Sequence, residues 1–359
     1  MSKKNEMTDA QRVRALLNRQ KPDRVPIYPF AHGGFPVVYN KLSIQEAFNN
    51  PEATFSAQRK TAQNFGWIST PMIGYASFGG WEFGGDIKWP SAEFAQAPSV
   101  TRNPVATPEE AMNLELPDVK KAGIVPLLVE TSTLAAQENP DHEPFKIVFQ
   151  LEGTFNTACN IAGADQFTRW LIKAPDAAHH LLRLASDFLV ELAQYYKDTF
   201  GTESLLPWGG EPTSSNQLIS PKMFERFALP YIKETHEKLI AMGYKHIFKH
   251  LCGEQNKNLP FWAEIPMGDP GFVSIGHEVE LERAGEFFPN DIIVGNLDTS
   301  IIQIGTPEQV YEATKTTLEK GKKLDGGFIL APGCDLPPMA PVENVEAITR
   351  AANDFGWYE

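Results

Sequence analysis

Apolar and polar positions along the chain follow two recurring patterns. Short runs rich in β-branched and aromatic residues each end in glycine, proline or a polar residue, and an amphipathic stretch follows. The short runs predict buried strands, and apolar residues spaced three or four apart predict helices. The strand candidates lie at 24–30, 66–74, 145–153, 203–210, 246–253, 271–278, 291–298 and 326–334.

Helix boundaries are marked by capping residues. Ser220 is a predicted N-cap directly before Pro221, and Thr306 with Pro307 repeats the pattern, because proline suits the first helical position. The predicted helices lie at 7–20, at 164–200 with a break near Pro175, at 220–243 and at 306–323.

This alternation of strands and helices predicts an α/β fold. Eight β–α units in a chain of 359 residues favour a (β/α)8 TIM barrel. We expect a single domain over 1–359, with an N-terminal helical extension over 1–24. The alternative is a doubly wound open sheet, but no GxGxxG or Walker A pattern follows a strand, and the glycines at 79–85 have the wrong spacing.

Composition and charge limit the classes of partner that we expect the protein to bind and the compartment in which we expect it. The formal net charge of -13 argues against binding to nucleic acid or to an anionic membrane. The first 20 residues lack the apolar core of a secretory signal, and no apolar run of about 18 residues is present. Three cysteines form no disulfide framework. We therefore expect a soluble, cytoplasmic protein with thiols free to bind a metal.

Polar residues gather at the carboxyl ends of the predicted strands, where the active sites of TIM barrels lie. Any barrel has some polar residues there, so most of these positions carry little weight alone. The residues are Glu152, Glu211, His250, Cys252, His277, Glu278, Asp298 and Cys334.

The most specific pattern is a histidine and a cysteine two positions apart, with a second cysteine after a later strand. In an extended segment His250 and Cys252 point to the same face, and a barrel can bring Cys334 to the same rim. Three nitrogen and sulfur ligands with a fourth position open are typical of catalytic zinc. The alternative is a hydrogen-bonded core histidine with small buried cysteines, and we expect that role only for Cys159, within a helix.

Two further stretches resemble a known family. Residues 295–320, which begin Gly-Asn-Leu-Asp, and residues 218–234, with Ser-Pro before a phenylalanine, are similar to segments of the uroporphyrinogen decarboxylase superfamily. The resemblance covers most of the chain and implies a TIM barrel. True decarboxylases carry an arginine-rich stretch after the first strand, whereas residues 28–36 contain no arginine, and Cys334 stands where the family has a late histidine.

The set of His250, Cys252 and Cys334 instead resembles the zinc-dependent corrinoid methyltransferase branch of that superfamily. The resemblance implies bound Zn²⁺ and a partner, a corrinoid protein that carries cobalamin. Glu152 and Glu211 are candidates for the fourth ligand, of which we favour Glu152, and both are expected catalytic residues. His32 and His277 are expected to hydrogen-bond or protonate the substrate.

The expected reaction moves a methyl group between a small substrate and the cobalamin of the corrinoid protein. Aromatic residues at 67–89, together with Phe30, Phe35 and Tyr39, are expected to form an apolar pocket, which favours a methoxylated aromatic donor. The alternatives are transfer from methylcobalamin to a thiol or folate, a decarboxylase-like reaction, and a zinc-stabilised binding barrel. The sequence does not determine the oligomeric state, for which a homodimer is one candidate.

Overall fold

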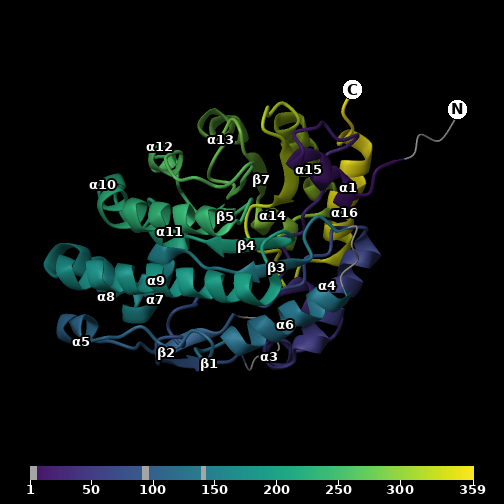
Figure 1. Cartoon of the computed structure of the whole chain (residues 1–359). Helices are drawn as coiled ribbons and strands as arrows, with labels where there is room; N and C mark the ends of the chain where they lie inside the picture. The colour runs from purple at the N-terminus through teal and green to yellow at the C-terminus, as the bar shows by residue number, and fades with distance from the viewer. Residues whose placement is uncertain (1–5, 91–96, 139–142) are drawn as a thin grey trace, which may run out of the picture.

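The computed structural model describes residues 6–90, 97–138 and 143–359. A parallel sheet of six strands, in the order β3 to β8, curls into a barrel with helices around its outside (Figure 1). The predicted α/β barrel is thereby confirmed. The strands are β3 (Ile147–Gln150), β4 (Leu205–Gly210), β5 (Phe248–Leu251), β6 (Phe272–Ile275), β7 (Ile292–Leu297) and β8 (Phe328–Pro332).

The first predicted strand occupies its barrel position with only a short ladder. Leu330 N–H in β8 donates to the carbonyl of Pro26 at 3.0 Å, and Tyr28 N–H donates to the carbonyl of Leu330 at 2.9 Å. Pro26 and Pro29 have no N–H to donate, so the ladder ends after these bonds.

The predicted strand at 66–74 is wrong, because these residues form no strand. Side-chain amides hold this segment in place of a ladder. Gln58 accepts from Met72 N–H at 2.9 Å and donates to the carbonyl of Met72 at 2.7 Å. Gln150 in β3 pairs in the same way with the backbone of Tyr75, at 3.1 and 2.8 Å. Two glutamine side chains thus close the barrel where a second strand is absent.

Alternate residues of the strands fill the barrel interior. On β3 to β6 the even-numbered side chains point inward and the odd-numbered ones pack against the outer helices, as the period of two in a strand requires. The interior cluster also includes side chains from 28–30 and 68–72, which confirms that both segments line the barrel. Its members from the strands are Val148, Leu206, Trp208, Phe248, Phe272, Ile292, Val294, Ile329 and Ala331.

The helices agree with the predicted boundaries. Thr8 caps the leading helix, a break at Ala174 separates α8 from α9, and Thr306 caps α15 with a capping box. The long helices are α1 (Asp9–Leu17), α4 (Pro51–Phe65), α6 (Val125–Glu138), α7 (Thr154–Ala162), α8 (Ala164–Lys173), α9 (Pro175–Phe200), α11 (Leu229–Met242), α15 (Pro307–Gly321) and α16 (Val342–Phe355). The short ones are α2 (Phe35–Tyr39), α3 (Ile44–Asn49), α5 (Pro108–Met112), α10 (Pro221–Met223), α12 (Leu259–Trp262), α13 (Leu281–Phe287) and α14 (Thr299–Ile304). In the described parts of the chain, none has both the length and the apolarity to cross a bilayer.

The predicted helix at 220–243 is capped by Ser220 as expected but is not uniform. A π-helical turn over Phe224–Ala228 separates α10 from α11. Pro230 follows that turn, at the start of α11. Proline lacks an N–H and its ring crowds the carbonyl four residues before it, so a wider turn ahead of Pro230 relieves both problems.

The N-terminal extension belongs to the core. Ala10, Val13 and Leu16 of α1 pack into the interior cluster. Asp9, only 4% exposed, accepts hydrogen bonds from Arg12 at 2.6 Å and from Arg24 at 2.7 Å. The helix therefore closes the end of the barrel where the strands begin.

A small antiparallel pair, β1 (Asp86–Lys88) with β2 (Ser99–Arg102), stands apart from the barrel near α3 and α5 (Figure 1). Both strands are mostly exposed, so no apolar alternation in the sequence predicted them. Tyr75 and Ala76, which precede this pair in the chain, contribute to the wall beside the barrel mouth.

Candidate metal centre

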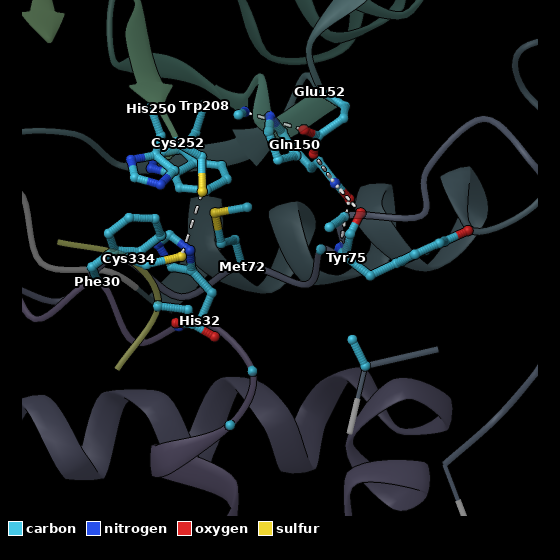
Figure 2. Close-up of a pocket in the computed structure, with 18 of the residues that line it drawn as sticks. Phe30, His32, Met72, Tyr75, Gln150, Glu152, Trp208, His250, Cys252 and Cys334 are labelled. Carbon is cyan, nitrogen blue, oxygen red and sulfur yellow. Dashed lines mark hydrogen bonds between the residues drawn. The ribbon is translucent and has the colours of Figure 1, made fainter. Parts of the chain in front are cut away.

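His250, Cys252 and Cys334 meet at the carboxyl ends of the strands, as predicted. One ligand atom of each lies within 4.8 Å of those of the other two, and the two sulfur atoms are 3.9 Å apart (Figure 2). His250 is the inward residue near the end of β5, and Cys252 follows on the same face. Cys334 comes from the loop after β8. The β-strand period thus aligns the first pair, and the curvature of the barrel brings the third residue to them.

The imidazole of His250 is oriented for a metal. Its Nδ1 contacts the hydroxyl of Ser274, an inward residue of β6, at 3.0 Å. Its Nε2 is buried and has no hydrogen-bond partner. A buried polar nitrogen without a hydrogen-bond partner destabilises the folded state, and binding of a metal ion to the nitrogen removes that cost. One nitrogen and two thiols are also the donor types that zinc prefers, so the residues fit this ion.

The two thiols influence each other. The hydrogen bond between them lowers the pKa of Cys334 to about 4 and raises the pKa of Cys252. One of the pair therefore carries a negative charge at neutral pH, which is the form that binds a metal. Binding through both sulfurs requires loss of the second proton as well.

A pocket of about 290 Å³ opens beside the three residues. Its wall is largely apolar, as predicted, but only two of the expected aromatic residues contribute to it. Phe30 and Tyr75 line it, whereas Trp67, Phe78 and Phe83 are buried elsewhere in the core and Phe35 and Tyr39 stack on each other. The larger apolar side chains of the wall include Phe30, Ile44, Phe48, Met72, Tyr75, Trp208 and Pro338.

Glu152 lies in this pocket, on the side away from the cysteines (Figure 2). Its carboxylate accepts hydrogen bonds from Gln150 at 2.7 Å and from Gly210 N–H at 3.2 Å. Burial raises the pKa of Glu152 to about 7. Its oxygens are not within 4.8 Å of all three other ligand atoms, so its role as the fourth ligand stays a prediction.

Glu211 has a different position from the one expected of a catalytic residue or ligand. It is fully buried and is absent from the pocket lining. Its carboxylate accepts from the N–H groups of Phe155 and Asn156, in the first turn of α7, and lies 3.7 Å from Lys249 Nζ. The physical reason is strand parity, which turns this odd-numbered residue outward. There it caps the positive end of a helix dipole.

The two histidines predicted to contact the substrate, His32 and His277, differ in their position relative to the pocket. The side chain of His277 is half exposed on the rim, and its Nδ1 lies 3.7 Å from a carboxylate oxygen of Glu278. His277 does not line the pocket, so its position does not support direct contact with a substrate there. His32 does line the pocket and contacts Tyr28 Oη at 2.6 Å. Burial lowers the pKa of His32 to about 3, so its imidazole is neutral and can hydrogen-bond but holds no spare proton at neutral pH.

Several pocket residues escaped the sequence analysis. Gln150 and Trp208 are inward residues of β3 and β4, and strand parity from Glu152 and Gly210 would have found both. Asp335 also lines the pocket, and the one sequence signal for this position is that it directly follows Cys334. Phe48 comes from α3, and nothing in its local sequence connects it to the barrel mouth.

The comparisons with known proteins agree with this geometry. The profile described as uroporphyrinogen decarboxylase (URO-D) matches residues 8–355. The chain belongs to the uroporphyrinogen decarboxylase family. A uroporphyrinogen decarboxylase of Anaeromyxobacter is 22% identical, over 94% of this chain and 97% of its own length.

Within the family, greater similarity is found to methyltransferases. Methylcobamide:CoM methyltransferase MtbA of Methanosarcina acetivorans is 26% identical over 98% of this chain and 99% of its own. A methyltransferase from Methanosarcina mazei has the same fold, with a TM-score of 0.81, 23% identity and coverage of 98% and 99%. These relatives confirm the predicted resemblance to the corrinoid methyltransferase branch of the family and the predicted class of enzyme.

The contact of Ser274 with His250 gives a first testable expectation for this family member. Ser274→Ala removes the partner of Nδ1 and frees the imidazole to rotate, so we expect zinc affinity to fall about 10- to 100-fold. Competition with a fluorescent chelator measures that affinity. Ser186→Ala is the matched control, because Ser186 is equally buried but bonds Thr235 outside the barrel. Equal affinities in the two variants would contradict the role of Ser274.

A second expectation concerns the pocket wall. Glu82 is buried, accepts from Tyr75 Oη at 2.7 Å and from Gly79 N–H at 2.6 Å, and has a pKa that burial raises. A carboxyl group with a raised folded-state pKa binds its proton more tightly when folded. Its contribution to stability is therefore complete at low pH and is lost as pH rises from the unfolded value of about 4.5.

Glu82→Gln removes this titration. The substitution changes the free energy of unfolding by some amount at about pH 5. As pH rises to about 8, the free energy of unfolding of the variant should increase relative to that of the wild type, by about 1.4 kcal/mol for each pH unit between the unfolded and folded pKa values of Glu82. Urea unfolding of both proteins at the two pH values measures the change. A difference that is constant with pH, or that moves in favour of the wild type, would show that Glu82 is ionised throughout.

Proposed function

We propose that this protein transfers a methyl group from the methylated cobalamin of a separate corrinoid protein to a thiol, at a zinc ion held by His250, Cys252 and Cys334. The observation that carries the proposal is the buried, unpartnered Nε2 of His250 facing two thiols beside a pocket. Zinc bound there would lower the pKa of a thiol that joins it, making the sulfur nucleophilic at neutral pH.

The thiol acceptor is favoured over the methoxylated aromatic donor that the sequence suggested. Two kinds of relative are named for reactions of coenzyme M, a thiol: the methylcobamide:CoM methyltransferases, and a methylated-thiol–coenzyme M methyltransferase of Methanosarcina mazei, which is 29% identical over 58% of this chain and 53% of its own. None of those names refers to a methyl ether. Of the alternatives predicted from the sequence, transfer from methylcobalamin to a thiol therefore has the better support.

In the proposed reaction a sulfur–carbon bond forms as the cobalt–carbon bond breaks. The electron pair of the broken bond stays on cobalt, which becomes Co(I), and the thiol proton leaves. Glu152 is one of two carboxyl groups in the pocket and can take this proton, and Gln150 and Gly210 hold it in place. The aromatic wall of Phe30, Trp208 and its neighbours keeps water from the reacting sulfur.

A porphyrinogen decarboxylase is disfavoured by the same pocket. A substrate with many carboxylates needs arginine or lysine side chains for paired hydrogen bonds. No lysine or arginine is among the described residues that line the pocket, in agreement with the absence of arginine from residues 28–36.

The test is an assay of zinc-loaded protein with methylcobalamin and a set of thiols. We expect the absorbance of methylcobalamin to fall and a methyl thioether to appear in equal amount. Two other reactions are run in parallel, demethylation of a methoxybenzene by Co(I) cobalamin and release of carbon dioxide from uroporphyrinogen. Demethylation of the ether without methylation of any thiol would restore the aromatic donor and overturn the proposal.

A further inference from the structure

The pocket beside the metal residues is unusual in its charge. Among the described residues its lining includes two carboxyl groups, Glu152 and Asp335, and no lysine or arginine. The basic side chains present are His32 and His250. His32 is held neutral by burial, and His250 is a proposed metal ligand. A charged group of a substrate would therefore meet no permanent positive charge on this wall.

Neighbouring residues do not supply the missing charge. The nearest lysine in sequence to the metal residues, Lys249, points away from the barrel interior and pairs with Glu211 at 3.7 Å. The six residues 91–96, which precede the lining residue Ala97 and lie outside the described part of the chain, have no lysine or arginine in their sequence. An anion in the pocket would thus be stripped of water with no positively charged side chain on the wall to compensate it.

The rest of the lining suits an apolar group. Phe30, Phe48 and Trp208 present aromatic rings, and Met72 adds a flexible thioether that adapts to different shapes. The volume of about 290 Å³ is at the lower end of the range for small-molecule sites, enough for a thiol with a ring or short alkyl body.

We propose that the methyl acceptor of this pocket is an uncharged thiol with an apolar body, and that the pocket selects against thiols that carry a sulfonate or carboxylate. This inference rests on the proposed function and adds to it the class of substrate. It sets the chain apart from the relatives named for coenzyme M, whose sulfonate is a permanent anion.

The test compares thiols that differ in charge but share a skeleton. One pair is 2-mercaptoethanol and coenzyme M, and the other is benzyl mercaptan and 4-(mercaptomethyl)benzoate. With methylcobalamin as donor, we expect kcat/KM to be at least about tenfold higher for the neutral member of each pair, with benzyl mercaptan the best of the four. Equal or better use of the anionic thiols would overturn the inference.

A gain-of-function variant makes the test sharper. Ala97 lines the pocket and is exposed, so it tolerates a longer side chain. Ala97→Arg should raise kcat/KM for coenzyme M relative to 2-mercaptoethanol by about tenfold, because it places a guanidinium at the mouth. Ala97→Gln is the matched uncharged control and should leave the ratio as in the wild type. An unchanged ratio in Ala97→Arg would count against charge as the cause.

Failure of the inference can be separated from failure of the proposed function. If no thiol at all is methylated, the proposed function is wrong. Calorimetric binding of benzyl mercaptan and 4-(mercaptomethyl)benzoate to the zinc-loaded protein then still decides the charge preference of the pocket. Tighter binding of the benzoate would overturn the inference whatever the assay shows.

Discussion

Cys334→Ala is expected to lose both bound zinc and methyl transfer while the barrel stays folded. The variant removes one of three soft ligands, and the remaining His250 and Cys252 leave an ion with too few protein donors. Because a metal contributes several kcal/mol to such a reaction, kcat/KM should fall by at least about a thousandfold. Elemental analysis of wild type and variant in parallel gives the zinc content, and circular dichroism reports the fold.

Cys159→Ala is the control, because it removes the remaining cysteine of the chain. Cys159 is fully buried in α7 and is not among the three clustered residues. We expect it to keep its zinc and its activity and to lose about 1 kcal/mol of stability from the small cavity. Full activity in a zinc-free Cys334→Ala protein would show that the cluster is not the reactive centre.

Asp9→Ala is expected to have the largest effect on stability. The carboxylate of Asp9 is almost fully buried between Arg12 and Arg24 and also accepts from Ile27 N–H at 3.1 Å. Its loss leaves the buried Arg24 without its ion-pair partner, which typically costs about 3–5 kcal/mol, whereas Arg12 keeps Asp23. The midpoint and slope of urea unfolding measure this change. Where the variant is folded its methyl transfer should be normal, since α1 lies at the end of the barrel opposite the metal residues.

Asp86→Ala provides the comparison. Asp86 also bonds an arginine, Arg102, at 2.7 Å, but both side chains are more than half exposed. Water and salt screen such a pair, so the unfolding midpoint should stay where it is in the wild type. If Asp9→Ala shifted the midpoint no further than Asp86→Ala, the buried network would not be what fixes α1.

Strand parity explains which site predictions held. His250 and Cys252 share a face because they are two apart, and this could be read directly from the sequence. The same count, continued from these residues, separates Glu152, which lies in the pocket, from Glu211, which faces the outer helices. His277 lies in the turn after β6, where its side chain is half exposed. Strand order and parity can be counted from the sequence alone, so the position of Glu211 outside the pocket lining was predictable; the catalytic roles of Glu211 and His277 stay predictions.

Other features depend on contacts that no local pattern records. Residues 66–74 looked like a strand, but the side chain of Gln58 takes the backbone bonds of Met72, and Gln150 takes those of Tyr75 directly after the segment. Phe48 reaches the pocket from the short helix α3, which is not part of any barrel strand. Such loops and connections are fixed by tertiary packing, and the aromatic residues in them were equally suited to core and pocket.

The way the base of the barrel is closed has a consequence for how the chain is made. Val25 N–H donates to the carbonyl of Gly356 at 2.9 Å, and Tyr358 N–H donates to the carbonyl of Asp23 at 3.0 Å. On a ribosome the segment at 23–25 therefore waits until residues 356–358 have been translated before these partners exist. Until then the apolar face of α1 and the strand beside β8 have no complete binding surface, and contacts of such long range fold slowly. The nascent chain therefore exposes these apolar surfaces to aggregation until residues 356–358 have left the ribosome.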